Sequence, residues 1–179
     1  NLFDNQDFSG ASDEFMQINP KHLDKGQRAE FTFKKAYCLL ENGNVSEALN
    51  GFKAVEAMPA SDYTAPSRYV IGYINYDLKH FKEALNWFEK SVKDSRFADL
   101  SAYYMIECRF MLSDYAYVTA NGEDMYAKVP QERKPQLARI ISESWLVLGD
   151  AERARKYMEL NAKEGGQPSG RAEWFYRGS

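Results

Sequence analysis

Histidine and cysteine, on which most metal sites and many active sites depend, are scarce in this chain of 179 residues. The two cysteines, Cys38 and Cys108, lie 70 positions apart, so no disulfide framework or zinc-ligand spacing is present, and we expect two free thiols in the core. The two histidines are isolated, with His22 in a proline-flanked loop and His80 at a helix start. No glycine-rich phosphate loop or nucleophile motif occurs. The sequence therefore predicts no enzyme, no metal site and no cofactor.

An excess of basic charge and a long apolar run are also missing. Lys and Arg total 23 against 26 Asp and Glu, which gives a net charge of −3 and a pI near 5.5. A nucleic-acid surface needs clustered basic side chains, so nucleic acid is not an expected partner. No apolar run approaches the length that crosses a bilayer, so no membrane span is expected in this chain.

A short cassette recurs along the chain: a polar residue, an aromatic or small apolar residue, two variable positions, and then Ala or Val. It occurs as Asp7-Phe8-x-x-Ala11, Asn44-Val45-x-x-Ala48, His80-Phe81-x-x-Ala84, Asp114-Tyr115-x-x-Val118 and Asp150-Ala151-x-x-Ala154. The closing residues are 37, 36, 34 and 36 positions apart. In four copies a large apolar residue follows four positions later: Phe15, Phe52, Phe88 and Met158. Five copies in register predict a repeat protein.

The spacing and residue types resemble the tetratricopeptide repeat, a pair of antiparallel helices of about 34 residues. In that family a small residue in the first helix and the Ala of the second helix let the two backbones approach. The first-helix position holds Ala36, Gly72, Ile106 and Ser142. The third copy departs from the pattern there and again at Val118 and Gly122. The resemblance implies an all-α fold, an α-solenoid of stacked antiparallel helix pairs in a right-handed superhelix.

The resemblance covers nearly the whole chain, which we expect to be one repeat array. Its units are a partial repeat 1–20, repeats 25–60, 65–96, 98–130 and 133–165, and a partial repeat 170–179. The residues by themselves also predict an all-α fold. Apolar positions at helical spacing lie between proline and glycine breakers, and no segment shows the alternation typical of a strand. The expected helices are 8–19, 25–42, 45–57, 65–79, 81–94, 98–112, 114–128, 133–148, 150–163 and 170 onward. Asn44 (with Glu47 in a capping box), Asp114 and Asp150 are the expected N-caps.

The chain does not begin with Met and shows no signal-peptide zones, so we expect it to be a piece of a longer protein. A repeat array cut at its ends exposes apolar helix faces. We expect Leu2, Phe3 and Phe8 at one end, and Trp174 and Phe175 at the other, to fold back or to contact another molecule. End-to-end self-association through these ends is one form of that contact.

In tetratricopeptide proteins the ligand groove is lined by first-helix side chains that point away from the second helix. Carried onto this sequence, the stripe consists of Phe33, Tyr37 and Leu40; Tyr69, Tyr73 and Tyr76; Tyr103, Glu107 and Phe110; and Arg139, Glu143 and Leu146. Spacings of three and four residues put each set on one helical face. Two interpretations stay open: the rings pack between neighbouring first helices, or they form an aromatic groove that binds a peptide.

With the resemblance, these features predict a protein–protein interaction scaffold that binds a peptide or protein segment in a concave aromatic groove. The Lys and Asn clamp by which some tetratricopeptide domains hold a chaperone tail is absent, because Phe33 and Tyr37 stand in its place. The Tyr-rich first helices also resemble bacterial extracytoplasmic tetratricopeptide proteins. That likeness favours the bacterial cell envelope and suggests an alternative, an envelope component that binds glycans or nutrients or assists assembly. A structural spacer in a larger array is the third hypothesis.

Overall fold

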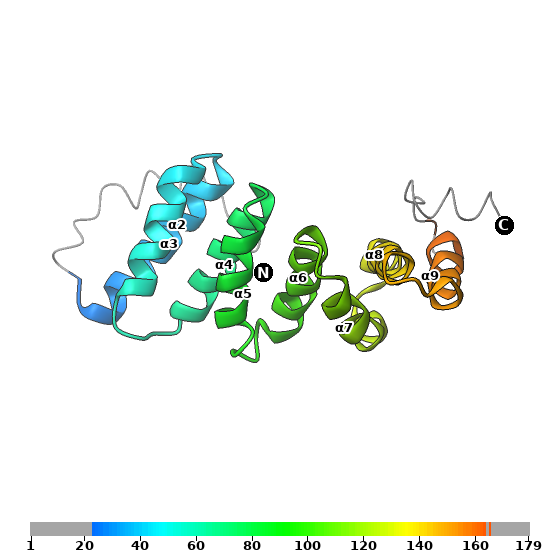
Figure 1. Cartoon of the computed structure of the whole chain (residues 1–179). Coiled ribbons are helices and arrows are strands. Elements are labelled where there is room, and N and C mark those ends of the chain that lie inside the picture. Colours follow the sequence, from blue (N-terminus) through cyan, green and yellow to red (C-terminus); the bar gives the residue numbers. More distant parts are fainter. Residues whose placement is uncertain (1–22, 164, 166–179) are drawn as a thin grey trace. The chain divides into compact units, whose positions relative to one another are not determined.

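The computed structural model describes residues 23–163 and residue 165 (Figure 1). This part of the chain contains eight α-helices, one short 3₁₀ helix and no strand, which confirms the all-α prediction. The helices are α2 (Lys25–Glu41), α3 (Val45–Ala57), α4 (Thr64–Asp77), α5 (Phe81–Ser91), α6 (Ala98–Met111), α7 (Tyr115–Lys128), η2 (Gln131–Arg133), α8 (Lys134–Val147) and α9 (Ala151–Lys163). The predicted helices 8–19 and 170 onward, and both partial repeats, lie outside the described residues.

The helices pack in adjacent pairs within two compact units. Unit 1 ends at Phe97 and contains the pairs α2–α3 and α4–α5, and unit 2 begins at Ala98 and contains the pairs α6–α7 and α8–α9. Within each unit the second helix of one pair also packs against the first helix of the next, α3 against α4 and α7 against α8. Each unit is described by itself below.

The turn inside each pair has the same backbone geometry all four times. One residue adopts a left-handed conformation: Gly43 (φ 86°), Lys79 (φ 64°), Ser113 (φ 65°) and Gly149 (φ 88°). The next amide donates to the carbonyl five residues back, as Asn44 N to Leu39 O (2.8 Å), His80 N to Asn75 O (2.8 Å), Asp114 N to Arg109 O (2.8 Å) and Asp150 N to Trp145 O (2.9 Å). This is the Schellman ending of a helix, and it satisfies carbonyls that the helix leaves unpaired.

Two of the three predicted side-chain caps form. The Asp114 carboxylate accepts from the Tyr117 amide at 3.2 Å, and the Asp150 carboxylate accepts from the Arg153 amide at 2.9 Å. Asn44 occupies the N-cap position of α3, but its side chain makes no capping hydrogen bond. A capping box forms instead at the start of α2, where Asp24 and Gln27 bond reciprocally. Such a box satisfies amides at the free end of the helix.

The core of unit 1 lies between its helix pairs and depends on small residues where helices meet. Phe52 and Ala48 of α3 belong to one buried cluster with residues of α2 and α4. A Cβ built on Gly72 of α4 would lie 2.9 Å from the Phe88 ring of α5. The glycine therefore makes room for that ring, as the small first-helix residue of the pattern implies.

In unit 2 the third pair, α6–α7, forms although its residues depart from the sequence pattern. Ile106 and Val118 are fully buried at the two positions where the other pairs have smaller residues. Gly122 stands where Phe52, for example, stands in the first pair, and a Cβ there would lie 2.6 Å from Ile141 of α8. The space that a large side chain fills elsewhere is thus filled from the neighbouring helix.

The helix bounds agree with the predicted ones within a few residues, and the largest difference is that α5 ends at Ser91 rather than at residue 94. Both cysteines are buried and free, as expected. None of the described helices is long and apolar enough to cross a membrane.

Candidate functional site

On α2 the predicted stripe is divided between core and surface. Phe33 is only 1% exposed, and its ring centroid lies 5.4 Å from that of Phe52 and 5.2 Å from that of Tyr63. Tyr37 is half-buried one turn further along α2, with its ring 6.2 Å from Phe33. Leu40 packs against the same core. In this helix Tyr37 is therefore the stripe residue that offers a ring at the surface.

On α4 the three tyrosines differ in exposure. Tyr69 is half-buried and stacks on Phe97, with centroids 5.1 Å apart. Tyr73 is 41% exposed, and its ring lies 6.3 Å from that of Tyr76. Tyr76 in turn packs edge-on against Phe81, the first residue of α5, at 6.0 Å. Tyr73 is thus the exposed member of a small aromatic cluster in which Tyr76 packs against both Tyr73 and Phe81.

In unit 2 the stripe on α6 is polar and buried. The Tyr103 hydroxyl donates to the Glu107 carboxylate, and both residues are buried. The Arg133 guanidinium lies 4.8 Å from the Tyr103 ring centroid and 5.2 Å from that of Tyr104, whose hydroxyl oxygen accepts from Nη1 of Arg133 at 3.2 Å. These contacts place a cation beside two rings, one of which donates its hydroxyl to a buried carboxylate. They also stabilise the entry into α8, because Arg133 precedes that helix.

Phe110 of α6 and the two charged α8 residues of the stripe come together. The Arg139 guanidinium lies 5.9 Å from the Phe110 ring centroid. It also pairs with the Glu143 carboxylate at 3.0 Å. Phe110 is half-buried and packs edge-on against Tyr115 at 5.9 Å. The two charges that α8 contributes to the stripe thus neutralise each other.

Burial controls the protonation of the groups around Glu107. Burial, and secondarily the Glu107 carboxylate, raises the pKa of the Tyr103 hydroxyl above its usual range. The same two causes raise the pKa of the Cys108 thiol to about 12. Burial also raises the pKa of Cys38. Neither thiol is in the thiolate form at neutral pH, so neither is a nucleophile there.

Large apolar side chains reach the surface only on one kind of helix in the described part of the chain. The exposed ones are Tyr73, Leu78, Leu100, Met111, Val147 and Leu148. All six belong to first helices of pairs, α4, α6 and α8, or to the residue that caps their C-terminal ends. The second helices α3, α5, α7 and α9 carry none. The exposed apolar surface therefore follows the first helices, where the stripe was predicted.

The sequence did not predict three residues near the stripe: Arg133, Met111 and Val147. Arg133 lies in a short 3₁₀ segment, and no local pattern connects it with Tyr103. Met111 and Val147 are the last residues of α6 and α8 and lie 36 positions apart. The repeat spacing, extended from Phe110 by one residue, was the signal that could have found them.

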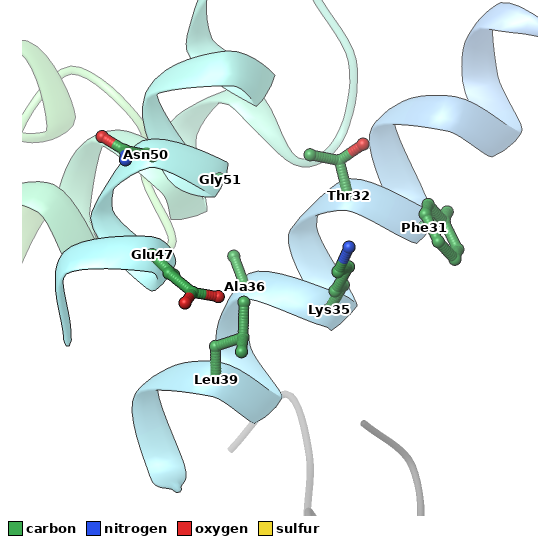
Figure 2. Close-up of a pocket in the computed structure, with 8 residues that line it drawn as sticks. All are labelled: Phe31, Thr32, Lys35, Ala36, Leu39, Glu47, Asn50 and Gly51. Atoms are coloured by element: carbon green, nitrogen blue, oxygen red, sulfur yellow. The ribbon is translucent and has the colours of Figure 1, made fainter. Parts of the chain in front are cut away.

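Two pockets lie outside the stripe. One, of about 370 Å³, is on the α2–α3 pair, where Figure 2 shows Ala36 facing the turn of α3 that carries Gly51. The other, of about 400 Å³, lies on α7, α8 and α9 and contains an ion pair between Lys156 and Glu123 at 3.5 Å. Neither pocket is lined by a histidine or cysteine, and no group of described residues could hold a metal ion. Their linings suggest no reaction.

Comparison with known proteins gives matches in fold. No protein-family model matches the sequence, and no curated protein is significantly similar to it. The crystal structure of MamA matches with a TM-score of 0.70 at 14% identity, over 89% of this chain and 89% of MamA. MamA from AMB-1 gives a TM-score of 0.72 at 14% identity, over 87% and 88% of the two chains. BtubC from P. vanneervenii gives 0.63 at 12% identity, over 91% of this chain and 74% of BtubC.

Identities of 12–14% show the fold alone. That fold is a helical solenoid built from adjacent helix pairs, so the fold class expected from the sequence is confirmed. The resemblance to tetratricopeptide repeats is accordingly supported by the fold.

Proposed function

We propose that the chain is a protein-interaction scaffold and that the first helices of its pairs carry the surface that recognises a partner. One observation supports this most strongly: among the described residues, every exposed large apolar side chain lies on those helices or their caps. The similarity in fold to MamA and BtubC is consistent with this role, since helical repeats commonly act as binding surfaces.

The chemistry of the exposed residues suits a protein partner. Tyr73 offers a broad ring and a hydroxyl. Its neighbour Tyr76 restricts the Tyr73 side chain, so Tyr73 loses little conformational entropy when a partner binds. Met111, which is 52% exposed, has a flexible apolar side chain that adapts to the shape of a bound surface. Aromatic residues and methionine are enriched in protein interfaces for these reasons.

The two alternatives have less support. A spacer would cover its first helices with its own side chains, as Phe33 and Tyr103 are covered, but the six exposed apolar side chains remain uncovered. A glycan site stacks sugars on open ring faces. Among the described aromatic residues only Tyr73 is classed as exposed.

The test compares two triple variants in affinity capture from an extract of the cells that make the protein. Tyr73→Ser, Met111→Ser and Val147→Ser remove exposed apolar side chains from three first helices. Lys53→Ser, Asn86→Ser and Ala116→Ser place the same residue at exposed positions of three second helices.

We expect the first-helix variant to lose the proteins that the wild type captures and the second-helix variant to retain them. Helical circular dichroism and the urea midpoint are measured for both, so that a loss of folding is recognised. Equal capture by all three proteins contradicts the proposed function.

A further inference from the structure

We infer that the first-helix surface of unit 1 binds a lysine or arginine side chain presented by a basic peptide or protein segment. This inference rests on the proposed function and narrows it, because it names the chemical class of the partner at α2 and α4. It concerns four residues, Tyr37 and Glu41 of α2 and Tyr73 and Asp77 of α4, which we call the Tyr–acid surface.

The same two-residue motif occurs on both first helices of unit 1. Glu41 follows Tyr37 by four residues, and Asp77 follows Tyr73 by four residues. Residues four apart are neighbours on a helical face, so each ring lies next to a carboxylate. The two motifs are 36 positions apart, which is the repeat spacing. They therefore occupy equivalent places on their helix pairs.

The two helices that carry the motifs are held by one core. Phe33 and Leu39 of α2 and Val70 and Ile74 of α4 belong to a single buried cluster, and Tyr37 packs against it. Tyr73 is supported by Tyr76 at 6.3 Å. The Tyr–acid surface is thus presented by packed helices, so a ligand would not have to order it.

The carboxylates stand where a helix disfavours negative charge. Glu41 and Asp77 are the last residues of α2 and α4, beside carbonyl groups that make the C-terminal end of a helix electronegative. Neither helix has a basic residue in its last turn. Both side chains are exposed, and neither forms an ion pair or hydrogen bond in the described part of the chain. A cation from a partner would relieve this repulsion.

The cations nearest in sequence do not compensate these carboxylates. On α2 the nearest cations before Glu41 are Lys35 and Lys34. Lys35 lines the pocket on the α2–α3 pair, and Lys34 pairs with Glu30. Lys79 follows Asp77 by two residues, beyond the end of α4, and no ion pair joins the two among the described residues. The negative potential at the Tyr–acid surface is thus left for an external cation.

The helix-pair fold does not require acids at these positions. The equivalent last residues of α6 and α8 in unit 2 are Met111 and Val147. The last turn of α6 also contains Arg109, which pairs with Asp114 at 3.1 Å. The acids of unit 1 therefore serve something other than the closing of the hairpin.

Rings beside carboxylates suit an organic cation with an apolar stem. A lysine or arginine side chain can lay its methylene groups on a tyrosine ring, hold its charge over the ring face and bond to a carboxylate. A small inorganic cation has no apolar stem to lay on the tyrosine rings. A basic segment of protein is accordingly the ligand that uses all four residues.

The probe is a short fluorescein-labelled peptide of leucine, serine and lysine, and its matched control has glutamate in place of every lysine. Binding to the full chain is measured by fluorescence anisotropy at low and at physiological ionic strength. We expect the lysine peptide to bind and the glutamate peptide not to bind. Salt should weaken binding, because the charges are exposed.

Two charge-matched double variants localise the binding. Glu41→Gln with Asp77→Asn should raise the Kd of the lysine peptide about tenfold, which is about 1.4 kcal/mol. Glu47→Gln with Glu83→Gln changes the net charge equally on the second helices α3 and α5, again 36 positions apart. Gln at 83 keeps an acceptor for the Trp87 indole N–H. This control should change the Kd less than about twofold.

Equal losses in the two double variants would mean that only overall charge matters, and this would overturn the inference. Failure of the lysine peptide to bind the wild type would overturn it as well. The proposed scaffold function is tested separately by the serine triple variants. If capture depends on the first helices but the lysine peptide does not bind, the scaffold stands and its partner is not basic.

Discussion

Ala36 and Gly51 mark a close approach of α2 and α3, since a Cβ built on Gly51 would lie 2.7 Å from the Cβ of Ala36. Real Cβ atoms do not come so close, so any larger residue at 51 must push the two helices apart. The contact explains why a glycine stands inside α3, where glycine by itself weakens a helix.

Gly51→Ala should therefore destabilise the protein. Alanine gains about 1 kcal/mol in helix propensity, but overpacking a rigid contact costs about 1–3 kcal/mol, so we expect a net loss of up to about 2 kcal/mol. The free energy of urea unfolding measures it. Gly26→Ala is the matched control, because its Cβ would meet only Asp24 at 3.7 Å, an ordinary contact. A Gly51→Ala protein as stable as the Gly26→Ala protein would contradict the close approach.

The left-handed turn residues give a prediction of opposite sign. Lys79→Gly and Ser113→Gly should each stabilise the protein by about 1 kcal/mol, because a side chain at positive φ is strained and glycine is not. Gly43→Ala should destabilise the protein by a similar amount. Urea unfolding compares these variants with Lys53→Gly in the middle of α3, which should lose about 1 kcal/mol. Destabilisation by glycine at both turn positions would show that the strain is absent.

The buried hydrogen bond between Tyr103 and Glu107 should contribute to stability. Tyr103→Phe removes the hydroxyl that donates to the carboxylate, and a buried carboxylate without this donor costs about 1–3 kcal/mol. Tyr115→Phe serves as the control, since the Tyr115 hydroxyl forms no hydrogen bond with any described residue and the ring contact with Phe110 would remain.

A double-mutant cycle separates this pair from general packing. Glu107→Leu in the Tyr103→Phe background removes the carboxylate that has lost this donor, so the double variant should lose less stability than the sum of the two single losses. Additive losses would indicate that the hydroxyl and the carboxylate are not coupled.

The raised pKa of Cys108 predicts a loss of stability at alkaline pH. The thiol has a pKa of about 12 in the fold and an ordinary pKa of 9.0, so below pH 9 it is protonated in both states and its ionisation costs no stability. Above pH 9 only the unfolded chain ionises, and stability falls by up to about 1.4 kcal/mol per pH unit until the folded pKa is reached. Tyr103, with its raised pKa, adds to the loss above pH 10.

Urea unfolding of the wild type and of Cys108→Ala at about pH 8 and about pH 10 isolates the thiol. The wild type should lose about 1 kcal/mol more than the variant between the two pH values. Equal losses would show that the thiol ionises normally in the fold. Slow reaction of the native protein with a thiol reagent is expected from the same burial.

The helix pairs could be predicted from the sequence because the spacing of apolar residues and the helix breakers repeat. The backbone conformation of the turns could not. Gly43 and Gly149 mark two of them, but Lys79 and Ser113 have the same left-handed backbone without a residue type that favours it. There the tertiary packing of the pair overrides the local preference.

The predicted stripe runs along four first helices, of which α4, α6 and α8 carry or end at the exposed large apolar side chains, but it did not separate core from surface. Phe33 and Tyr103 lie on the predicted face, yet neighbouring elements cover them: Tyr63 approaches Phe33, and Arg133 lies over Tyr103. Helical spacing gives the direction of a side chain, not what another segment places against it. Whether the stripe binds a ligand stays a prediction.

The four hairpin turns close through main-chain hydrogen bonds, from an amide to a carbonyl, and no side chain takes part in those bonds. The residues just before each turn, such as Glu41 and Met111, are therefore not needed to shape it. Substitutions there alter what the hairpin displays while its closure persists. Such a chain can change the side chains that it displays one residue at a time, as the acidic ends in unit 1 and the apolar ends in unit 2 illustrate.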